Sequence, residues 1–198
     1  METESGMNGL DIEYQIDGKS FFGYLADGSN GGRAPGILVV HQANGLSEHT
    51  KERTRMLADL GYVAFALDMY GEVPATRERA QAHLATVMDD PSLLRVRASA
   101  GFNFLKSCRN VDVKRLAAIG FCFGGSVVLE FVRDNRELAC AVVFHPGLNW
   151  LPEKDDRKIT CKVMACIGIE DPLIPASLRE KLIELDLDFV KPVLWDGE

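Results

Sequence analysis

The chain alternates between short, almost wholly apolar runs and longer segments of helical character. The apolar runs cover 37–41, 62–70, 115–121, 139–145, 162–168 and 191–195, and the helical segments cover 47–60, 76–88, 92–107, 126–134 and 177–186. Strands buried on both faces of a parallel sheet read as continuous apolar runs, and strands that alternate with helices are typical of α/β proteins. The pattern therefore predicts one α/β domain over residues 1–198, with a mostly parallel sheet flanked by helices.

The N-terminal region departs from this parallel pattern. Residues 11–25 form two strand-like runs that meet at Asp17-Gly18, a dipeptide that is favoured in tight hairpin turns. We therefore expect an antiparallel pair of strands at one edge of the sheet.

The helical segment 47–60 carries its apolar residues near its end. Met56, Leu57 and Leu60 predict the stripe by which this helix packs on the sheet. Further along, we expect residues 70–76 to make a long excursion of the chain over the surface.

The composition restricts the partners and the compartment. Of 198 residues, 46% are hydrophobic and 26% are charged, which suits one domain with a full core. The formal net charge of −7 argues against nucleic acid and anionic membranes as partners. The N-terminus lacks the features of a secretory signal, and no apolar run is long enough to span a bilayer. We expect a cytoplasmic protein that acts on a small molecule.

Five cysteines lie far apart in the sequence, without a CxxC pair. An odd number of widely spaced cysteines predicts reduced thiols, and it argues against a structural metal site. Cys122 differs from the others because it lies between Gly120 and Gly124, directly after an apolar run and before a helical segment.

The pattern around Cys122 matches a nucleophile elbow, the tight strand-to-helix turn that exposes a central nucleophile. Such a turn needs small residues on both sides, and Gly120 and Gly124 meet this need. At the N-terminus of the following helix, the unpaired N–H groups and the dipole stabilise a thiolate, and the N–H of Phe123 would face a developing oxyanion. The alternative is that Cys122 is a small buried hydrophobe in an unrelated turn.

Three segments resemble the dienelactone hydrolase family, cysteine-dependent members of the α/β-hydrolase superfamily. They are GFCFGG at 120–125, VVHQANGLSEHTKERTRMLADLGYVAFALDMYGE at 39–72 and CIGIEDPLIP at 166–175. The resemblance covers nearly the whole chain and implies an α/β-hydrolase fold. It also implies that Cys122 is the nucleophile and that Asp171 is the acid that orients a catalytic histidine. The backbone N–H groups of Phe123 and Ala43 would form the oxyanion hole.

Asp171 fits this role by its position as well. It follows the apolar run 162–169 and precedes Pro172 and Pro175, which predicts a rigid loop at the carboxyl end of a strand. The order of nucleophile and then acid along the chain is that of α/β-hydrolases. The alternatives are that Asp171 is a solvated loop residue, or that the neighbouring Glu170 is the acid.

The third member of the triad is missing, because no histidine follows His145. The family continues with a loop that carries a histidine and with a final helix, so we expect a truncated chain whose histidine follows shortly after Glu198. Without that helix, one face of the sheet would expose apolar surface. Of the histidines present, we interpret His145 as polar lining of the crevice, with the alternative that it is the base, and His41 as a structural residue.

Two further positions bear on the substrate. Gln42 stands where the family commonly has a glutamate that helps to activate the thiol, and an amide cannot take up a proton. Arg79 lies where the family has an arginine that holds a substrate carboxylate, and the alternative is a solvated charge on its helix. Gln42, Arg79 and His145 are therefore candidates to bind the substrate, which the resemblance implies is anionic.

The sequence as a whole predicts a hydrolase of a small ester or lactone that works through a thioester on Cys122, without a metal or an organic cofactor. The alternative is a non-catalytic α/β-hydrolase-fold protein that binds a ligand and lacks the triad histidine. A thiol oxidoreductase is disfavoured, because no second cysteine lies near Cys122 in the sequence. The oligomeric state is left open.

Overall fold

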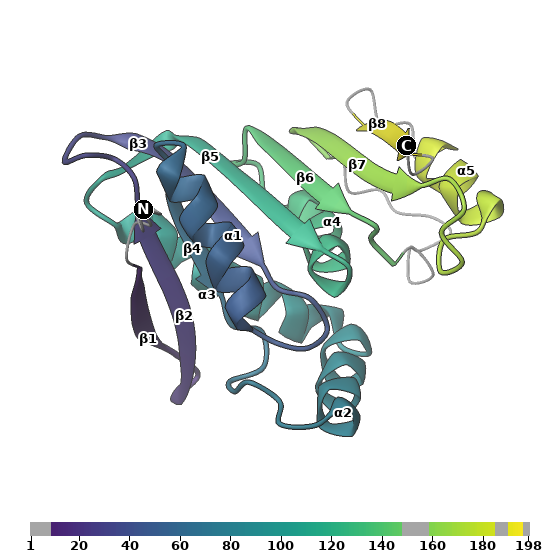
Figure 1. Cartoon of the computed structure of the whole chain (residues 1–198), viewed down its shortest axis with the longest axis horizontal. Coiled ribbons are helices and arrows are strands. Elements are labelled where there is room, and N and C mark those ends of the chain that lie inside the picture. Colours follow the sequence, from purple (N-terminus) through teal and green to yellow (C-terminus); the bar gives the residue numbers. More distant parts are fainter. Residues whose placement is uncertain (1–8, 148–158, 185–189, 196–198) are drawn as a thin grey trace, which may run out of the picture.

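The computed structural model describes residues 9–147, 159–184 and 190–195. In this part of the chain, eight strands form one sheet in the order β1-β2-β4-β3-β5-β6-β7-β8 (Figure 1). The strands are β1 Leu10–Ile16, β2 Lys19–Asp27, β3 Ala34–Val40, β4 Val63–Leu67, β5 Val111–Phe121, β6 Cys140–Phe144, β7 Lys162–Gly168 and β8 Val190–Trp195. The helices are α1 Glu48–Asp59, α2 Arg77–Met88, α3 Pro91–Ser107, α4 Phe123–Asp134 and α5 Ala176–Glu184.

The predicted mixture of parallel and antiparallel pairs is confirmed. β1 pairs antiparallel with β2, and β2 pairs antiparallel with β4, whereas all pairs from β4 to β8 are parallel. In the hairpin turn, Asp17 and Gly18 have φ angles of 49° and 76°. Two successive residues in the left-handed region make the type I′ turn that matches the twist of the strands, which explains why the dipeptide predicts this hairpin.

Helices cover the two faces of the sheet unequally. α3 and α4 pack together on one face, and α2 packs on α3, while α1 lies on the opposite face over β2, β4 and β3 (Figure 1). The larger core lies between the sheet and α3 and α4, and it includes Leu38, Phe65, Phe102 and Leu129, all nearly inaccessible to solvent. The smaller core lies under α1.

The apolar stripe predicted for α1 is confirmed at Leu57, which is partly buried against the smaller core, but it is wrong at Met56 and Leu60. Met56 is 48% exposed and Leu60 is 74% exposed, whereas the helix buries Thr50, Thr54 and Ala58. The buried residues are short, and the hydroxyl of Thr54 donates to the carbonyl of Thr50 at 2.8 Å, so this buried hydroxyl is paired. Short side chains allow the helix backbone to lie close to the sheet.

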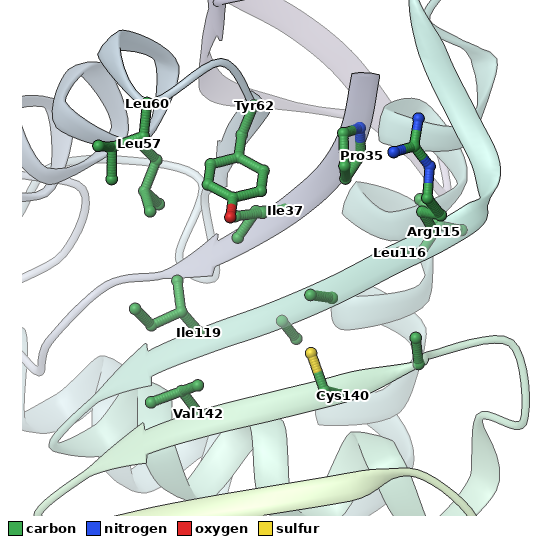
Figure 2. A pocket seen from close by; sticks show the side chains of 13 residues that line it. Pro35, Ile37, Leu57, Leu60, Tyr62, Arg115, Leu116, Ile119, Cys140 and Val142 are labelled. Atoms are coloured by element: carbon green, nitrogen blue, oxygen red, sulfur yellow. The ribbon is translucent and has the colours of Figure 1, made fainter. Parts of the chain in front are cut away.

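Next to α1, the same face of the sheet carries an apolar groove of about 430 Å³ (Figure 2). Leu57 and Leu60 line it from the helix side, and Ile119 of β5 and Val142 of β6 line it from the sheet. Ile119 and Val142 are partners in the parallel register, so their side chains lie next to each other on one face. The described residues do not test the expectation that a histidine and a helix follow Glu198.

The parallel strands point in one direction, so that their carboxyl ends meet at one edge of the sheet (Figure 1). The loops that follow β3, β5, β6 and β7 begin at this edge. Ligands of open α/β sheets bind outside the carboxyl ends of the strands, which makes these loops the place to search for a site.

Candidate active site

Cys122 lies at the turn between β5 and α4, as the pattern predicts. Its backbone has φ 54° and ψ −118°, a conformation that residues with a Cβ rarely adopt. Two hydrogen bonds hold the turn: the N–H of Cys122 donates to the carbonyl of Phe144 at 2.9 Å, and the N–H of Ser126 donates to the carbonyl of Cys122 at 3.2 Å. Cys122 is half-buried and is the N-cap of α4.

The two glycines that flank Cys122 are required by close backbone contacts. A Cβ on Gly120 would lie 2.1 Å from the carbonyl oxygen of Gly124, and a Cβ on Gly124 would lie 2.3 Å from that of Val40. Both contacts involve backbone atoms, which cannot rotate away as a side chain can. The start of α4 therefore packs directly on the ends of β5 and β3.

The loop after β3 lies beside this turn. The register pairs Val40 with Gly120, so the loop begins next to the strand that leads into Cys122. The carbonyl of Ala43 accepts a hydrogen bond from the hydroxyl of Tyr70 at 3.2 Å, and the carbonyl of Gln42 accepts one from the N–H of Gly45 at 3.1 Å. The loop that carries the predicted donor Ala43 is thus held by polar contacts on both of these carbonyls.

Aromatic rings connect this loop to the helix start. The ring of Phe123 packs against His41 and Tyr70, with centroid separations of 5.8 and 5.5 Å. Tyr70 is 5% exposed, so the predicted surface excursion of residues 70–76 is wrong at its first residue. Burial raises the pKa of the Tyr70 hydroxyl above its usual value, which keeps this donor protonated.

Asp171 lies in the loop after β7, at the same sheet edge as Cys122 but two strands away in the sheet order. Its carboxylate accepts a hydrogen bond from the N–H of Leu173 at 2.9 Å, and its carbonyl accepts one from the N–H of Ile174 at 3.1 Å. These local contacts make a tight turn in which the side chain is partly accessible.

His145 follows β6, the strand between β5 and β7. Its φ of 36° is in the left-handed region, and its N–H donates to the carbonyl of Cys166 at 2.8 Å. The residue is half-buried at the sheet edge where Cys122 and Asp171 also lie. The described contacts thus fix its backbone at this edge.

Arg79 forms an ion pair with Glu72, and the same carboxylate oxygen contacts the ring nitrogen Nε2 of His83. These two partners lower the pKa of Glu72 from 4.5 to about 2. The ring of His83 stacks on Tyr70 with a centroid separation of 5.0 Å. The cluster therefore lies against Tyr70. The pairing of Arg79 with Glu72 was not expected from the sequence.

A cavity of about 520 Å³ lies beside the loop of Ala43. Its lining includes Ala43, Pro74, Arg77 and Leu84. Arg77 thus contributes a positive side chain to the lining of this cavity. Arg79 is not part of the lining and forms its ion pair with Glu72.

His41 and Asp68 have structural surroundings. His41 is fully buried, and its two ring nitrogens contact the carbonyl of Gln42 and the N–H of Met69. The carboxylate of Asp68 accepts hydrogen bonds from the N–H groups of Tyr70, Gly71 and Phe22. These contacts agree with the structural interpretation of His41, and they show that Asp68 holds the backbone that follows β4.

Within the described ranges, no helix is both long and apolar enough to cross a membrane. Residues 9–147, 159–184 and 190–195 also contain no group of three or more histidine, cysteine, aspartate or glutamate side chains arranged to hold a metal ion.

The sheet order, together with the strained turn at its centre, defines an α/β-hydrolase fold. A model of the dienelactone hydrolase family matches residues 21–187, and the chain belongs to this family of hydrolases. A putative carboxymethylenebutenolidase of Aquifex aeolicus is 29% identical over 168 residues, which are 82% of this chain and 72% of that protein.

Two solved structures are similar over nearly the whole chain. One, named m3DLH, is 33% identical with a TM-score of 0.88, over 98% of this chain and 83% of that one. The other is the dienelactone hydrolase-like promiscuous phosphotriesterase P91 from metagenomic libraries, which is 31% identical with a TM-score of 0.88, over 96% of this chain and 82% of that one.

Proposed function

We propose that this protein is a cysteine-dependent hydrolase of small esters or lactones. The observation that carries the proposal is the backbone of Cys122, with φ 54° and ψ −118° at a strand-to-helix turn. A strained conformation of this kind is retained where the surrounding structure fixes it, and such sites are frequently functional. Gly120 and Gly124 allow the close contacts that fix it here. Membership of a hydrolase family supports the same conclusion.

The proposed reaction is acyl transfer in two steps. The Cys122 thiolate attacks the carbonyl carbon, and the N–H groups of Phe123 and Ala43 donate to the oxyanion that forms. The C–O bond then breaks, and the alkoxide leaves with a proton from a histidine that Asp171 orients. Water attacks the resulting thioester, which releases the acid and restores the thiol. The two steps require neither a metal nor an organic cofactor.

The histidine of this mechanism is not His41, because both of its ring nitrogens are engaged inside the core. His83 contacts Glu72 and stacks on Tyr70, so its contacts are with the cluster on α2. The prediction that the triad histidine follows Glu198 stays a prediction. It is tested by sequencing the gene beyond this codon and replacing any histidine found there by alanine.

The nucleophile is tested with p-nitrophenyl acetate. We expect one equivalent of p-nitrophenol to be released rapidly, together with a protein mass increased by one acetyl group that hydroxylamine removes, as for a thioester. The matched control Cys122→Ala releases no rapid equivalent and gains no acetyl group. If the native protein behaves like this control while remaining folded, the hydrolase proposal is wrong and the alternative of a non-catalytic binding protein is favoured.

The substrate is proposed to carry a negative charge, which Arg79 would bind, with Gln42 and His145 lining the same site. The pair with Glu72 means that a substrate carboxylate must compete for Arg79, whereas Arg77 lies at the cavity beside Ala43. Comparing Arg79→Gln with Arg77→Gln on a neutral ester and on its carboxylate-bearing analogue decides between them. We expect Arg79→Gln to raise the KM of the anionic ester alone; an effect of Arg77→Gln alone would transfer the role to that residue.

A further inference from the structure

We propose that His41 is a positioning residue for the oxyanion hole: it fixes the peptide group between Gln42 and Ala43, and thereby aims the N–H of Ala43 at the reacting carbonyl oxygen. This inference rests on the proposed function. It assigns a chemical role to a histidine that lies in the core and does not touch the substrate.

The argument begins with the geometry of one peptide group. The carbonyl of Gln42 and the N–H of Ala43 belong to the same planar trans peptide and point in opposite directions. Nδ1 of His41 lies 2.6 Å from this carbonyl oxygen, and the N–H of Gly45 lies 3.1 Å from it. Holding the carbonyl in place fixes the direction of the Ala43 N–H, because the plane has no internal rotation of its own.

The partners of His41 determine its tautomer. A carbonyl oxygen can only accept a hydrogen bond, so Nδ1 must carry the proton that it donates to Gln42. The N–H of Met69 can only donate, and it lies 3.0 Å from Nε2, so Nε2 must be unprotonated. The imidazole is therefore neutral, and burial lowers its pKa below the usual value, which favours the same form. In this tautomer, the Nδ1–H group of His41 donates to the Gln42 carbonyl in the loop after β3.

The ring of His41 is also packed against two aromatic side chains. It is fully buried, with Tyr70 at a centroid separation of 4.9 Å and Phe123 at 5.8 Å. Tyr70 in turn donates to the carbonyl of Ala43 at 3.2 Å, which fixes the next peptide group of the loop. The imidazole thus contacts Phe123, which supplies the second predicted donor, while it bonds the peptide that supplies the first. Preorganised donors of this kind stabilise an oxyanion without reorganisation during the reaction.

Two variants separate this role from simple core packing. In His41→Asn, the amide nitrogen Nδ2 takes the place of Nδ1 and keeps a donor for the Gln42 carbonyl, while the contact with Met69 is lost. In His41→Gln, the amide oxygen takes the place of Nε2 and keeps an acceptor for Met69, while the donor to Gln42 is lost. Both replace a ring by a smaller amide, so they disturb packing to a similar extent.

The measurement is the rate of Cys122 acylation by p-nitrophenyl acetate, compared with the rate of alkylation by iodoacetamide. Acylation passes through an oxyanion, whereas alkylation displaces iodide at a saturated carbon and forms none. We expect His41→Gln to lose about 10- to 100-fold in acylation rate, as for a misplaced donor, with alkylation unchanged. His41→Asn should retain an acylation rate within roughly threefold of that of the native protein, because it keeps the donor to the Gln42 carbonyl. A threefold loss of rate corresponds to less than half of the free energy of a tenfold loss.

A second measurement on the unaltered protein covers the case in which both variants unfold. An aryl trifluoromethyl ketone adds to the Cys122 thiolate, forming an S–C bond and converting the ketone oxygen to an oxyanion. When the Ala43 N–H donates to this anion, the Gln42 carbonyl becomes more negative, so the bond from Nδ1 strengthens. The Nδ1–H proton resonance of ¹⁵N-histidine-labelled protein should therefore move downfield when the inhibitor adds.

The outcomes distinguish the two proposals. If the native protein shows no Cys122-dependent acylation, the proposed hydrolase function fails, and the role of His41 fails with it. If the native protein is acylated but the two folded variants are equally fast or equally slow, only the role of His41 is overturned. An Nδ1–H resonance that does not move on inhibitor addition overturns it as well.

Discussion

At the scale of single residues, the conformation of Cys122 makes an unusual prediction about stability. Residues held in sparsely populated backbone regions cost about 1–3 kcal/mol, whereas the greater freedom of glycine in the unfolded chain costs roughly 0.5–1 kcal/mol. With φ 54° and ψ −118°, Cys122 stores strain that glycine would relieve. We therefore expect Cys122→Gly to be more stable than Cys122→Ala by about 0.5–2 kcal/mol in urea unfolding.

The control for this comparison is Glu52, an exposed residue within α1. At an ordinary helical position the order reverses, and Glu52→Gly should be less stable than Glu52→Ala by about 1 kcal/mol. The same order at both positions would mean that the backbone at Cys122 carries no strain of its own.

Glu72 allows a prediction about ionisation. Arg79 and His83 lower its pKa from 4.5 to about 2, so the carboxylate stays ionised well into the acid range. The stabilisation that this brings is present above pH 4.5 and is lost as the pH falls towards 2. We expect Arg79→Gln to raise the pKa of Glu72 towards 4.5, as measured by NMR titration of its carboxyl carbon. Arg77→Gln, on the first turn of the same helix, is the control; equal shifts in both variants would contradict the specific pairing.

At the scale of elements, mutations in α1 should affect stability in the opposite order to that suggested by the hydrophobicity of its residues. Ala58 is 1% exposed under the helix, so Ala58→Val adds volume to a tight contact and should cost about 1–3 kcal/mol. Leu60 is 74% exposed, so Leu60→Ala should change stability by less than about 0.5 kcal/mol. Urea unfolding measures both variants. A larger loss for Leu60→Ala would restore the predicted leucine stripe as the packing face.

The elements themselves could be predicted because each is encoded locally. A continuous apolar run such as 62–67 fits a strand buried on both faces, and a left-handed turn at Asp17-Gly18 fits one type of hairpin. The face of α1 could not be predicted, because it depends on how closely the helix lies on the sheet. Hydrophobicity alone favours burial of Leu60 over Thr54, but the structure buries the shorter Thr54 and exposes Leu60.

The site shows the same division. The strand-to-helix turn at Cys122 could be predicted, because Gly120 and Gly124 have a local steric reason to be glycine. The contacts of Glu72 and Tyr70 could not, because they join residues that meet only when α2 folds back to the loop after β4. Tyr70 lies in the segment 39–72 that resembles the family, yet only the structure gives its hydroxyl a partner.

At the scale of the whole molecule, the two faces of the sheet are covered differently. α3 and α4 pack together over one face, whereas on the other face α1 contacts β2, β4 and β3 and leaves the apolar groove over β5 and β6 (Figures 1 and 2). Side chains such as Ile119 are partly accessible there. A contiguous, concave apolar surface can bind apolar molecules, whereas apolar residues that are scattered singly over a surface have no such role.

The groove predicts that this chain binds the dye anilinonaphthalene sulfonate in its native state. Val142 lies in the groove, so Val142→Lys places a charge among apolar side chains and should remove most of the dye fluorescence. Val113, on β5 but outside the groove, is already 42% exposed, so the matched change Val113→Lys should leave the fluorescence unaltered. Unfolding midpoints in urea confirm that both variants are folded. An equal loss in the two variants would show that the dye binds elsewhere, and that the groove is closed to apolar ligands in solution.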